Sequence, residues 1–253
     1  MSYFSHLAAA ERYAISRPPF HPLIIARIRE RLELTAPLDR ALDVACGTGQ
    51  STTPLRAIAR HVIGADRSLA MLSTTPRDDG IAYVAARAEQ HPWADESFDL
   101  ITVALAFHWF DREAFLREAR RTLRSNGWLV IYNNSIYGRM HGNPAFERWF
   151  KEEYLARYPS PPRSYRPFTA TDAHALGFEF TAREEYTNDV TFSLDAFAAY
   201  LMTQSNVIAA VEEGSEAADS VQSWLIDALR PRFLHPTAAF EFGGTLWFLR
   251  KES

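Results

Sequence analysis

The chain has 253 residues, 47% of them hydrophobic, which suits a globular core and excludes a disordered or fibrous protein. No stretch reaches the roughly 20 apolar residues of a membrane span, and residues 1–20 show no basic flank followed by an apolar region of the signal-peptide kind. One cysteine cannot form an internal disulfide, and we expect a soluble, cytoplasmic protein. The formal net charge of -4 argues against nucleic-acid and membrane partners, and we expect a small-molecule partner, with the oligomeric state open.

The first half of the chain predicts a parallel sheet. Residues 1–36 are expected to form a helical lid, and after them short apolar runs alternate with helical patterns over residues 37–134. Most of these runs are apolar on both faces, which is typical of strands covered by helices above and below. The expected strands are 40–45, 61–66, 81–86, 98–104 and 128–133.

A helix is predicted between the last two of these strands. Asp111 can cap its N-terminus, and its apolar stripe comprises Phe115, Leu116, Ala119 and Leu123. Asn126-Gly127 is expected to end this helix.

The second half is less regular. Residues 135–177 are aromatic and Pro-rich, and with 193–236 they are expected to form an α-rich cap inserted into the domain. Segments 178–192 and 237–253 read as two late strands that close the sheet as an antiparallel pair. We therefore expect an α/β fold over 1–253: one domain with a doubly wound, mostly parallel seven-stranded sheet.

A glycine turn follows the first strand. In Ala41 to Ser51, Gly47 and Gly49 can let a ligand lie against the backbone, before a helix expected near Ser51. Taken alone, this pattern is as often only a tight turn.

Acidic residues follow three strands in succession. Asp43, Asp66 and Glu89 should line one groove, because the carboxyl ends of parallel strands share one edge of the sheet, and Asp66 could accept the hydroxyls of a ribose. The third small residue of the dinucleotide fingerprint is missing after Gly49. The negative charge of Asp43 would repel a pyrophosphate, but it suits the positively charged amino group of an amino-acid moiety, reached directly or through water. These residues favour a cationic nucleoside over a dinucleotide.

Several motifs together carry a resemblance. Residues 43–49 (DVACGTG), 64–66 (GAD), 88–89 (AE), 97–101 (SFDLI) and 123–128 (LRSNGW) resemble the class I S-adenosylmethionine-dependent methyltransferases, with a Rossmann-like fold. The run His108-Trp109-Phe110, residues 200–205 (YLMTQS) and the pattern of Tyr13 with Arg17-Pro18 resemble the small-molecule branch that contains trans-aconitate methyltransferases. The family usually has Gly where Ala45 stands, which should hold the loop slightly further from the cofactor.

The resemblance implies S-adenosyl-L-methionine as cofactor and S-adenosyl-L-homocysteine as product. It assigns the loop to the methionine part, Asp66 to the ribose, Met71, Ala88 and Glu89 to the adenine, and Tyr13 and Arg17 to closing over the cofactor. The full set of expected cofactor-binding residues is Tyr13, Arg17, Asp43, Ala45, Gly47, Gly49, Gln50, Asp66, Arg67, Met71, Ala88, Glu89 and Ala104.

His108 is the candidate catalytic residue, because it follows the fourth strand where the sulfonium should point. It could orient a carboxylate, which needs no base, or take the proton of a phenol or alcohol, although a packed histidine is an equally good interpretation. Cap arginines (Arg139, Arg163, Arg166) are possible charge partners, but each is more typical of a surface residue. Cys46 is expected to be a small buried residue, and the histidine spacing predicts no metal site.

We expect methyl transfer to an oxygen, foremost a carboxylate, of a small organic molecule. Transfer to nitrogen or carbon, a methyltransferase-like binding protein without turnover, and nicotinamide-dependent oxidation are the alternatives, the last disfavoured by the missing third glycine.

Overall fold

The computed structural model describes residues 7–160, 167–212 and 214–252, which divide into two compact units. Unit 1 comprises Met1–Pro18, Ser135–Arg163 and Tyr186–Gly243. Unit 2 comprises Pro19–Asn134, Ser164–Glu185 and Gly244–Ser253. None of the described helices is long and apolar enough to cross a membrane.

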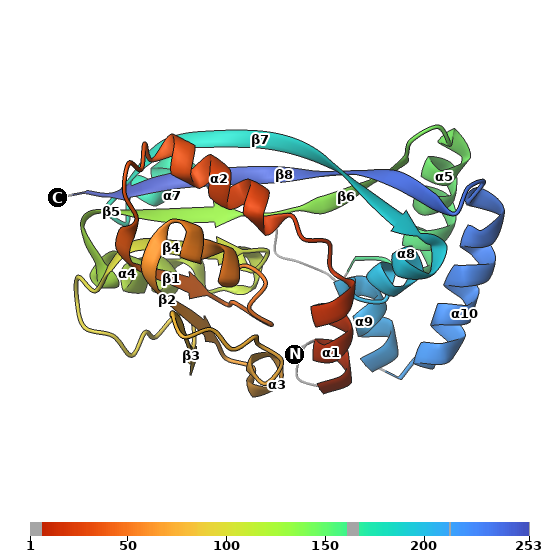
Figure 1. The fold of residues 1–253 in the computed structure, drawn as a ribbon, viewed down its shortest axis with the longest axis horizontal. Helices are drawn as coiled ribbons and strands as arrows, with labels where there is room; N and C mark the ends of the chain where they lie inside the picture. The colour runs from red at the N-terminus through yellow and green to blue at the C-terminus, as the bar shows by residue number, and fades with distance from the viewer. Residues whose placement is uncertain (1–6, 161–166, 213, 253) are drawn as a thin grey trace. The chain divides into compact units, whose positions relative to one another are not determined.

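A parallel sheet forms the centre of unit 2 (Figure 1), as predicted. Its first five strands have the hydrogen-bonded order β3-β2-β1-β4-β5, with every neighbouring pair parallel. The chain therefore changes direction across the sheet between β1 and β4, a switch point where open α/β sheets bind ligands. The strands are β1 (Leu38–Val44), β2 (Ala59–Asp66), β3 (Ile81–Ala85), β4 (Phe98–Ala104) and β5 (Leu123–Tyr132).

The two late strands complete the sheet. β8 (Thr237–Lys251) runs antiparallel to β5, from the pair Trp128 and Arg250 to the pair Tyr132 and Leu246. β7 (Phe178–Ser193) pairs with β8. β7 and β8 each contribute residues to both units.

Helix α4 (Arg112–Thr122) begins as the sequence predicts. The Asp111 side chain accepts a hydrogen bond from Ala114 N at 3.1 Å, and the predicted apolar stripe is buried. The predicted end at Asn126-Gly127 is wrong: the helix stops at Thr122, because Leu123 already pairs with Phe98 at the start of β5. Asn126 takes a φ of 62° inside that strand, a turn-like backbone that explains why it resembled a helix terminus.

The segment after the glycine turn also differs from expectation. In place of a helix near Ser51, a short 3-10 helix, η1, spans Thr53–Ala57. Because β2 begins at Ala59, the available segment holds only about two α-helical turns, roughly seven residues, and it includes Pro54.

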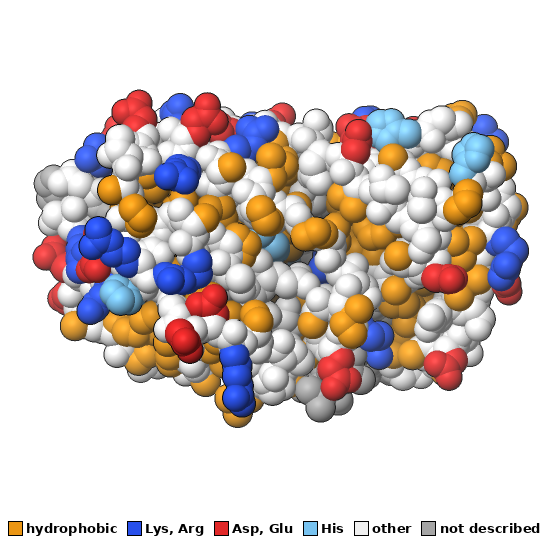
Figure 2. Space-filling model, viewed as in Figure 1, with side chains coloured by type: hydrophobic (Ala, Val, Ile, Leu, Met, Phe, Trp, Pro, Cys, Tyr) orange, Lys and Arg blue, Asp and Glu red, His pale blue; other side chains and the backbone are white. Residues whose placement is uncertain are grey.

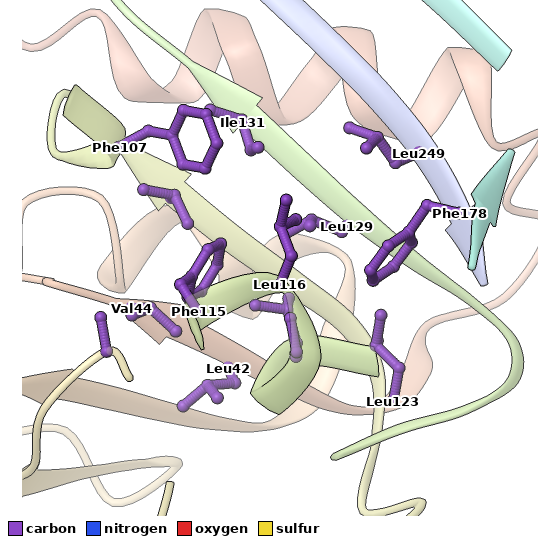
Figure 3. Packing of buried hydrophobic residues seen from close by; sticks show 14 of the residues in the cluster. Leu42, Val44, Phe107, Phe115, Leu116, Leu123, Leu129, Ile131, Phe178 and Leu249 are labelled. Carbon is purple, nitrogen blue, oxygen red and sulfur yellow. The ribbon is translucent and has the colours of Figure 1, made fainter. Parts of the chain in front are cut away.

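Unit 2 buries one apolar cluster beneath α4. Figure 3 shows Phe115 and Leu116 of α4 together with Leu129 of β5, Phe178 of β7 and Leu249 of β8. A large apolar side chain contributes roughly 1.5–3 kcal/mol when it is fully buried. This packing holds the strand ends of unit 2 in place. The other helical elements of the unit are α2 (His21–Arg31), α3 (Leu69–Leu72), η2 (Phe107–Trp109) and α7 (Ala170–His174).

Unit 1 has an aromatic core of its own. Phe146, Trp149 and Phe150 are buried there, as their helical spacing predicts, and the Phe197 and Phe240 rings stack with centroids 3.9 Å apart. Its helical elements are α1 (Leu7–Ser16), α5 (Pro144–Trp149), the π-helical turn η3 (Phe150–Tyr154), α6 (Leu155–Arg157), α8 (Leu194–Leu201), α9 (Ser205–Glu212), α10 (Ala218–Leu229) and η4 (Arg230–Arg232).

Unit 1 also contains a strand that the sequence reasoning missed. β6 (Ser135–Met140) pairs antiparallel with β8, from Ser135 and Gly243 to Met140 and Phe240. Gly138 interrupts its pattern with a φ of +72°, and a Cβ there would lie 2.5 Å from the Phe150 ring. The predicted α-rich cap therefore begins with a strand.

Candidate active site

The loop after β1 is shaped by residues with left-handed backbone. Gly47 and Gly49 have φ values of +56° and +81°, and Ala45 adopts 56°, a conformation that favours glycine. A Cβ on Gly49 would lie 2.5 Å from the Tyr83 hydroxyl, whereas a Cβ on Gly47 would meet nothing closer than the Met71 methyl at 3.9 Å. Gly49 is thus required by packing, while the backbone at Gly47 stays open to a ligand.

Asp43 is the anchor of this loop. Its carboxylate is fully buried and accepts hydrogen bonds from the hydroxyls of Ser51 at 2.6 Å, Thr52 at 2.8 Å and Thr102 at 3.0 Å. Burial raises the pKa of Asp43 to about 6, and the three hydroxyl donors oppose that rise. Asp43 thereby ties the loop to strand β4.

The three hydroxyl residues were missed by the sequence reasoning. Thr102 had a signal, since it is a polar residue within the apolar run of β4. Ser51 and Thr52 had none, because hydroxyl residues are common in turns. Whether Asp43 also acts on a cofactor amino group stays a prediction; the partners that the structure records are these hydroxyls.

Asp66 lies at the end of the neighbouring strand β2. Its two carboxylate oxygens accept hydrogen bonds from Gly47 N at 2.9 Å and Ser68 N at 2.8 Å. Burial is the largest influence on the Asp66 pKa and raises it, against hydrogen bonds from the backbone of Ser68, Gly47 and Arg67. A carboxylate has about four lone-pair sites, so Asp66 can still accept a further donor. The structure thus brings Asp66 directly against the glycine loop.

The end of β3 continues the same edge. Ala88 is buried, and Glu89 accepts a hydrogen bond from Asp111 N at 3.3 Å and lies 3.7 Å from Arg87. An open cavity of about 400 Å³ lies here, and Arg67 is part of its lining.

His91, which also lines this cavity, was not among the predicted site residues. Its Nδ1 lies 3.1 Å from the Thr122 hydroxyl, and burial lowers its pKa to about 4, so the ring is neutral at pH 7.

His108 lies in η2, directly after β4, with its ring 4.6 Å from that of Trp109. The side chain is exposed, which separates it from the packed histidine considered above. Leu105, the residue directly after β4, has a φ of 58°. A non-glycine residue with a left-handed backbone therefore follows β4, just as Ala45 follows β1. Ala104, the last residue of β4, is buried and pairs with Tyr132.

The remaining predicted residues fall in two groups. Met71 is buried in α3 and Gln50 lies in the loop of unit 2. Tyr13 and Arg17 lie in unit 1, where the Arg17 guanidinium is 4.5 Å from the centre of the Tyr13 ring.

The structure also shows where the candidate arginines of the cap and the single cysteine lie. Arg139 is exposed and pairs with Glu241 at 3.3 Å, while Arg163 and Arg166 lie outside the described residues. Cys46 is buried, as expected, and burial raises the pKa of its thiol. Among the residues that the structure describes, no group of His, Cys, Asp and Glu could hold a metal ion.

On the face shown in Figure 2, acidic and basic side chains are interspersed rather than gathered by sign. Nucleic-acid binding uses a continuous basic patch or stripe. That the protein has no nucleic-acid partner stays a prediction.

Comparisons with known proteins identify the family of the chain. The family described as "Methyltransferase domain" matches residues 42–131, which hold the end of β1, the loop after it, Asp66, Glu89 and His108. A Dictyostelium discoideum protein with a methyltransferase name is 30% identical over 181 residues, covering 70% of this chain and 68% of the relative. A demethylmenaquinone methyltransferase of Mycobacterium sp. (strain KMS) is 36% identical over 129 residues, covering 51% of this chain and 54% of that protein.

A solved structure from Anaeromyxobacter dehalogenans, described as a type II methyltransferase, has a TM-score of 0.69 and 24% identity over 90% of this chain and 95% of its own. That likeness shows the fold. The Dictyostelium discoideum relative is matched over more than two thirds of its length. The chain therefore belongs to the methyltransferases, and its sheet is that of the class I, S-adenosylmethionine-dependent enzymes.

Proposed function

We propose that this protein transfers a methyl group from S-adenosylmethionine to an oxygen of a small organic acid. The observation that carries the proposal is the pairing of Asp66 with Gly47: a carboxylate with free lone pairs lies against a loop whose backbone is open. When bound, the cofactor supplies a methyl group activated by the adjacent sulfonium.

The residues present fit that cofactor. The Thr48 hydroxyl is buried in the loop with no hydrogen-bond partner among the described residues, and a Cβ on Gly47 would meet nothing closer than the Met71 methyl at 3.9 Å, so the backbone there is open to a ligand. Such an orphaned group is stabilised when a ligand supplies the missing partner. Residues 45–50 would hold the methionine part, Asp66 the ribose, and Met71, Ala88 and Glu89 the adenine.

Calorimetry with S-adenosylhomocysteine tests the cofactor assignment. Asp66→Ala should weaken binding by roughly 1.5–3 kcal/mol, the range for hydrogen bonds to a charged group. Asp79→Ala, at an exposed loop position, is the control and should bind as the wild type does. Equal affinities for the wild type and Asp66→Ala would contradict the ribose assignment.

The acceptor decides what His108 does. A carboxylate is already a nucleophile, so His108 would orient it, and alignment with exclusion of water would be the main tasks of the site. The resemblance of residues 108–110 to the small-acid branch supports an acid.

A second candidate acceptor is a quinone-related carbon, favoured by the relatives named demethylmenaquinone methyltransferase. Forming a carbon–methyl bond at a ring carbon requires a proton to leave, and His108 could accept it. The alignment with those relatives covers about half of each protein, so the acceptor remains part of the proposal.

Release of S-adenosylhomocysteine with a panel of small acids, phenols and quinols separates the two. With an acid, His108→Gln should raise KM while kcat stays within about tenfold, because no proton transfer is lost. With a phenol or quinol, kcat should fall roughly 10²–10⁴-fold, because the group that accepts the proton is lost. Turnover with neither class would refute the proposed reaction.

A further inference from the structure

A second cavity of unit 2 lies beside helix α4. Its volume is about 560 Å³, and four basic and two acidic side chains line it: Arg117, Arg120, Arg121, Lys251, Asp95 and Glu96. The acidic residues directly precede β4, and α4 directly precedes β5. The cavity is therefore at the amino ends of these strands, whereas the glycine loop and Asp66 follow the carboxyl ends of β1 and β2.

The two acidic side chains of the cavity already have basic partners. Asp95 accepts a hydrogen bond from Arg121 Nη1 at 2.8 Å, and Glu96 lies 3.5 Å from Lys251 Nζ. Arg121 also donates to two backbone carbonyls of the segment before Asp95, so it holds the wall of the cavity together. The two other arginines of the lining are therefore in excess of the acidic side chains.

Arg117 and Arg120 supply this excess of positive charge. Arg120 is exposed and has no ion pair among the residues that the structure describes, whereas Arg117 pairs with Glu113. Both members of that pair are exposed, and such pairs contribute little to stability, so a multiply charged ligand can displace Glu113. The Arg120 side chain lies over Gly177, where a Cβ would overlap its Nε, so this glycine leaves room for the guanidinium.

The carbonyls at the C-terminal end of α4 would repel an anion through their partial negative charge, but other donors occupy them. Arg121 O accepts a hydrogen bond from Glu96 N at 3.0 Å, and Leu123 O accepts one from Lys251 Nζ at 2.7 Å. The repulsion that a helix C-terminus exerts on an anion is therefore reduced beside this cavity.

We propose that this cavity binds an oligophosphate group, either as a free chain or as the phosphate chain of a nucleotide. An oligophosphate carries several charged oxygens on a short chain, and guanidinium groups bind such oxygens with paired hydrogen bonds. Arg117 and Arg120 are three positions apart on one face of α4, so both can donate to one ligand. The volume falls in the roughly 300–1,000 Å³ of small-molecule sites, which gives room for more than one phosphate.

This inference goes beyond the proposed function and does not depend on it. Calorimetry with tripolyphosphate, with and without saturating S-adenosylhomocysteine, tests the cavity. The wild type should bind tripolyphosphate with the same affinity in both cases, and more weakly as sodium chloride is raised, because salt screens exposed charges. Competition between the two ligands would place the phosphates at the cofactor site and overturn the proposal. If S-adenosylhomocysteine does not bind, the cofactor assignment fails, and the tripolyphosphate titration still decides this proposal.

Two further probes define the chemistry of the ligand. Adenosine triphosphate, titrated with S-adenosylhomocysteine bound, distinguishes the sources: an affinity equal to that of tripolyphosphate favours a free chain, and tighter binding favours a nucleotide. Citrate, which carries three carboxylates, is the control for charge alone. Binding of citrate as tight as that of tripolyphosphate would overturn the assignment to phosphate.

Substitutions then test the residues. Arg120→Met keeps much of the side-chain length, removes the charge, and should weaken tripolyphosphate binding roughly 10-fold, because charged hydrogen bonds are lost. Arg120→Lys, which keeps the charge but not the fork, should fall between. The matched control is Arg77→Met, at an exposed arginine of unit 2 that also has no ion pair among the described residues, and it should bind as the wild type does. Thermal melts exclude unfolding as the cause of a loss. Unchanged tripolyphosphate affinity in a folded Arg120→Met would refute the proposed site.

Discussion

Replacing Asp43 by Asn should change how stability depends on pH. The Asp43 carboxylate is fully enclosed, and burial raises its pKa from 3.8 to about 6 against three hydroxyl donors. A carboxylate whose pKa is raised on folding contributes stability below its unfolded pKa, and that contribution is lost as the pH rises through its folded pKa. The wild type should therefore lose stability, relative to Asp43→Asn, between about pH 4 and pH 6.

The magnitude follows from the same values. At about 1.4 kcal/mol per pKa unit, moving the pKa from 3.8 to about 6 corresponds to about 3 kcal/mol over the whole range. Part of this change in stability occurs below about pH 4.5, where the measurement begins. The difference in the free energy of unfolding between the wild type and Asp43→Asn should therefore change by about 2 kcal/mol from about pH 4.5 to about pH 7.5.

Urea unfolding followed by circular dichroism and fluorescence measures this difference. Comparing two proteins cancels the other titrating groups, so only residue 43 is reported. Thr102→Val removes one hydroxyl that lowers the pKa of Asp43, and should move the loss of stability to higher pH. A difference between wild type and Asp43→Asn that is constant over this range would refute the account of a costly buried charge.

Two glycine experiments test the loop. Ala45→Gly should raise the free energy of unfolding by up to about 1 kcal/mol, because it relieves an alanine with a left-handed backbone. The control, Ala82→Gly on strand β3, should lower the free energy of unfolding by about 0.5–1 kcal/mol. Equal decreases in the melting temperatures of the two variants would contradict the strain at Ala45. Gly49→Ala should cost at least about 2 kcal/mol and weaken cofactor binding, because its Cβ meets the Tyr83 hydroxyl as well as the strained backbone. Gly142→Ala, with φ +73° and no atom within 4 Å of its Cβ, isolates the backbone strain and should cost only about 1 kcal/mol; similar unfolding energies for the two variants would show that Tyr83 does not matter.

Much of unit 2 could be predicted from the sequence because its signals are local. Strands β1 to β4 are short apolar runs, and Asp111 marks the start of α4 by its own side-chain bond. The end of that helix could not be predicted in the same way, since the pairing of Leu123 with Phe98 joins residues far apart in the chain. Strand β6 was missed for a related reason: it depends on β8, and Gly138 breaks its alternation.

In the candidate site, too, the features set by the local sequence could be predicted, and those set by contacts between distant segments could not. The glycine turn and Asp66 could be predicted, because backbone freedom and strand position are properties of the local sequence. The hydroxyls around Asp43 could not, since Thr102 reaches Asp43 across neighbouring strands. The environment of Arg17, built from α1 and the end of α8, likewise depends on packing between segments that are distant in sequence.

Strand β8 has a consequence for how the protein is made. It pairs with β5 in unit 2 and with β6 in unit 1, yet among the described elements it leaves the ribosome last. Until then, the nascent chain exposes the bare backbone edge of β5, a template for pairing with other chains. Slow translation before Thr237 should therefore increase aggregation during expression, and a peptide spanning β8 supplied in trans should rescue a truncated chain.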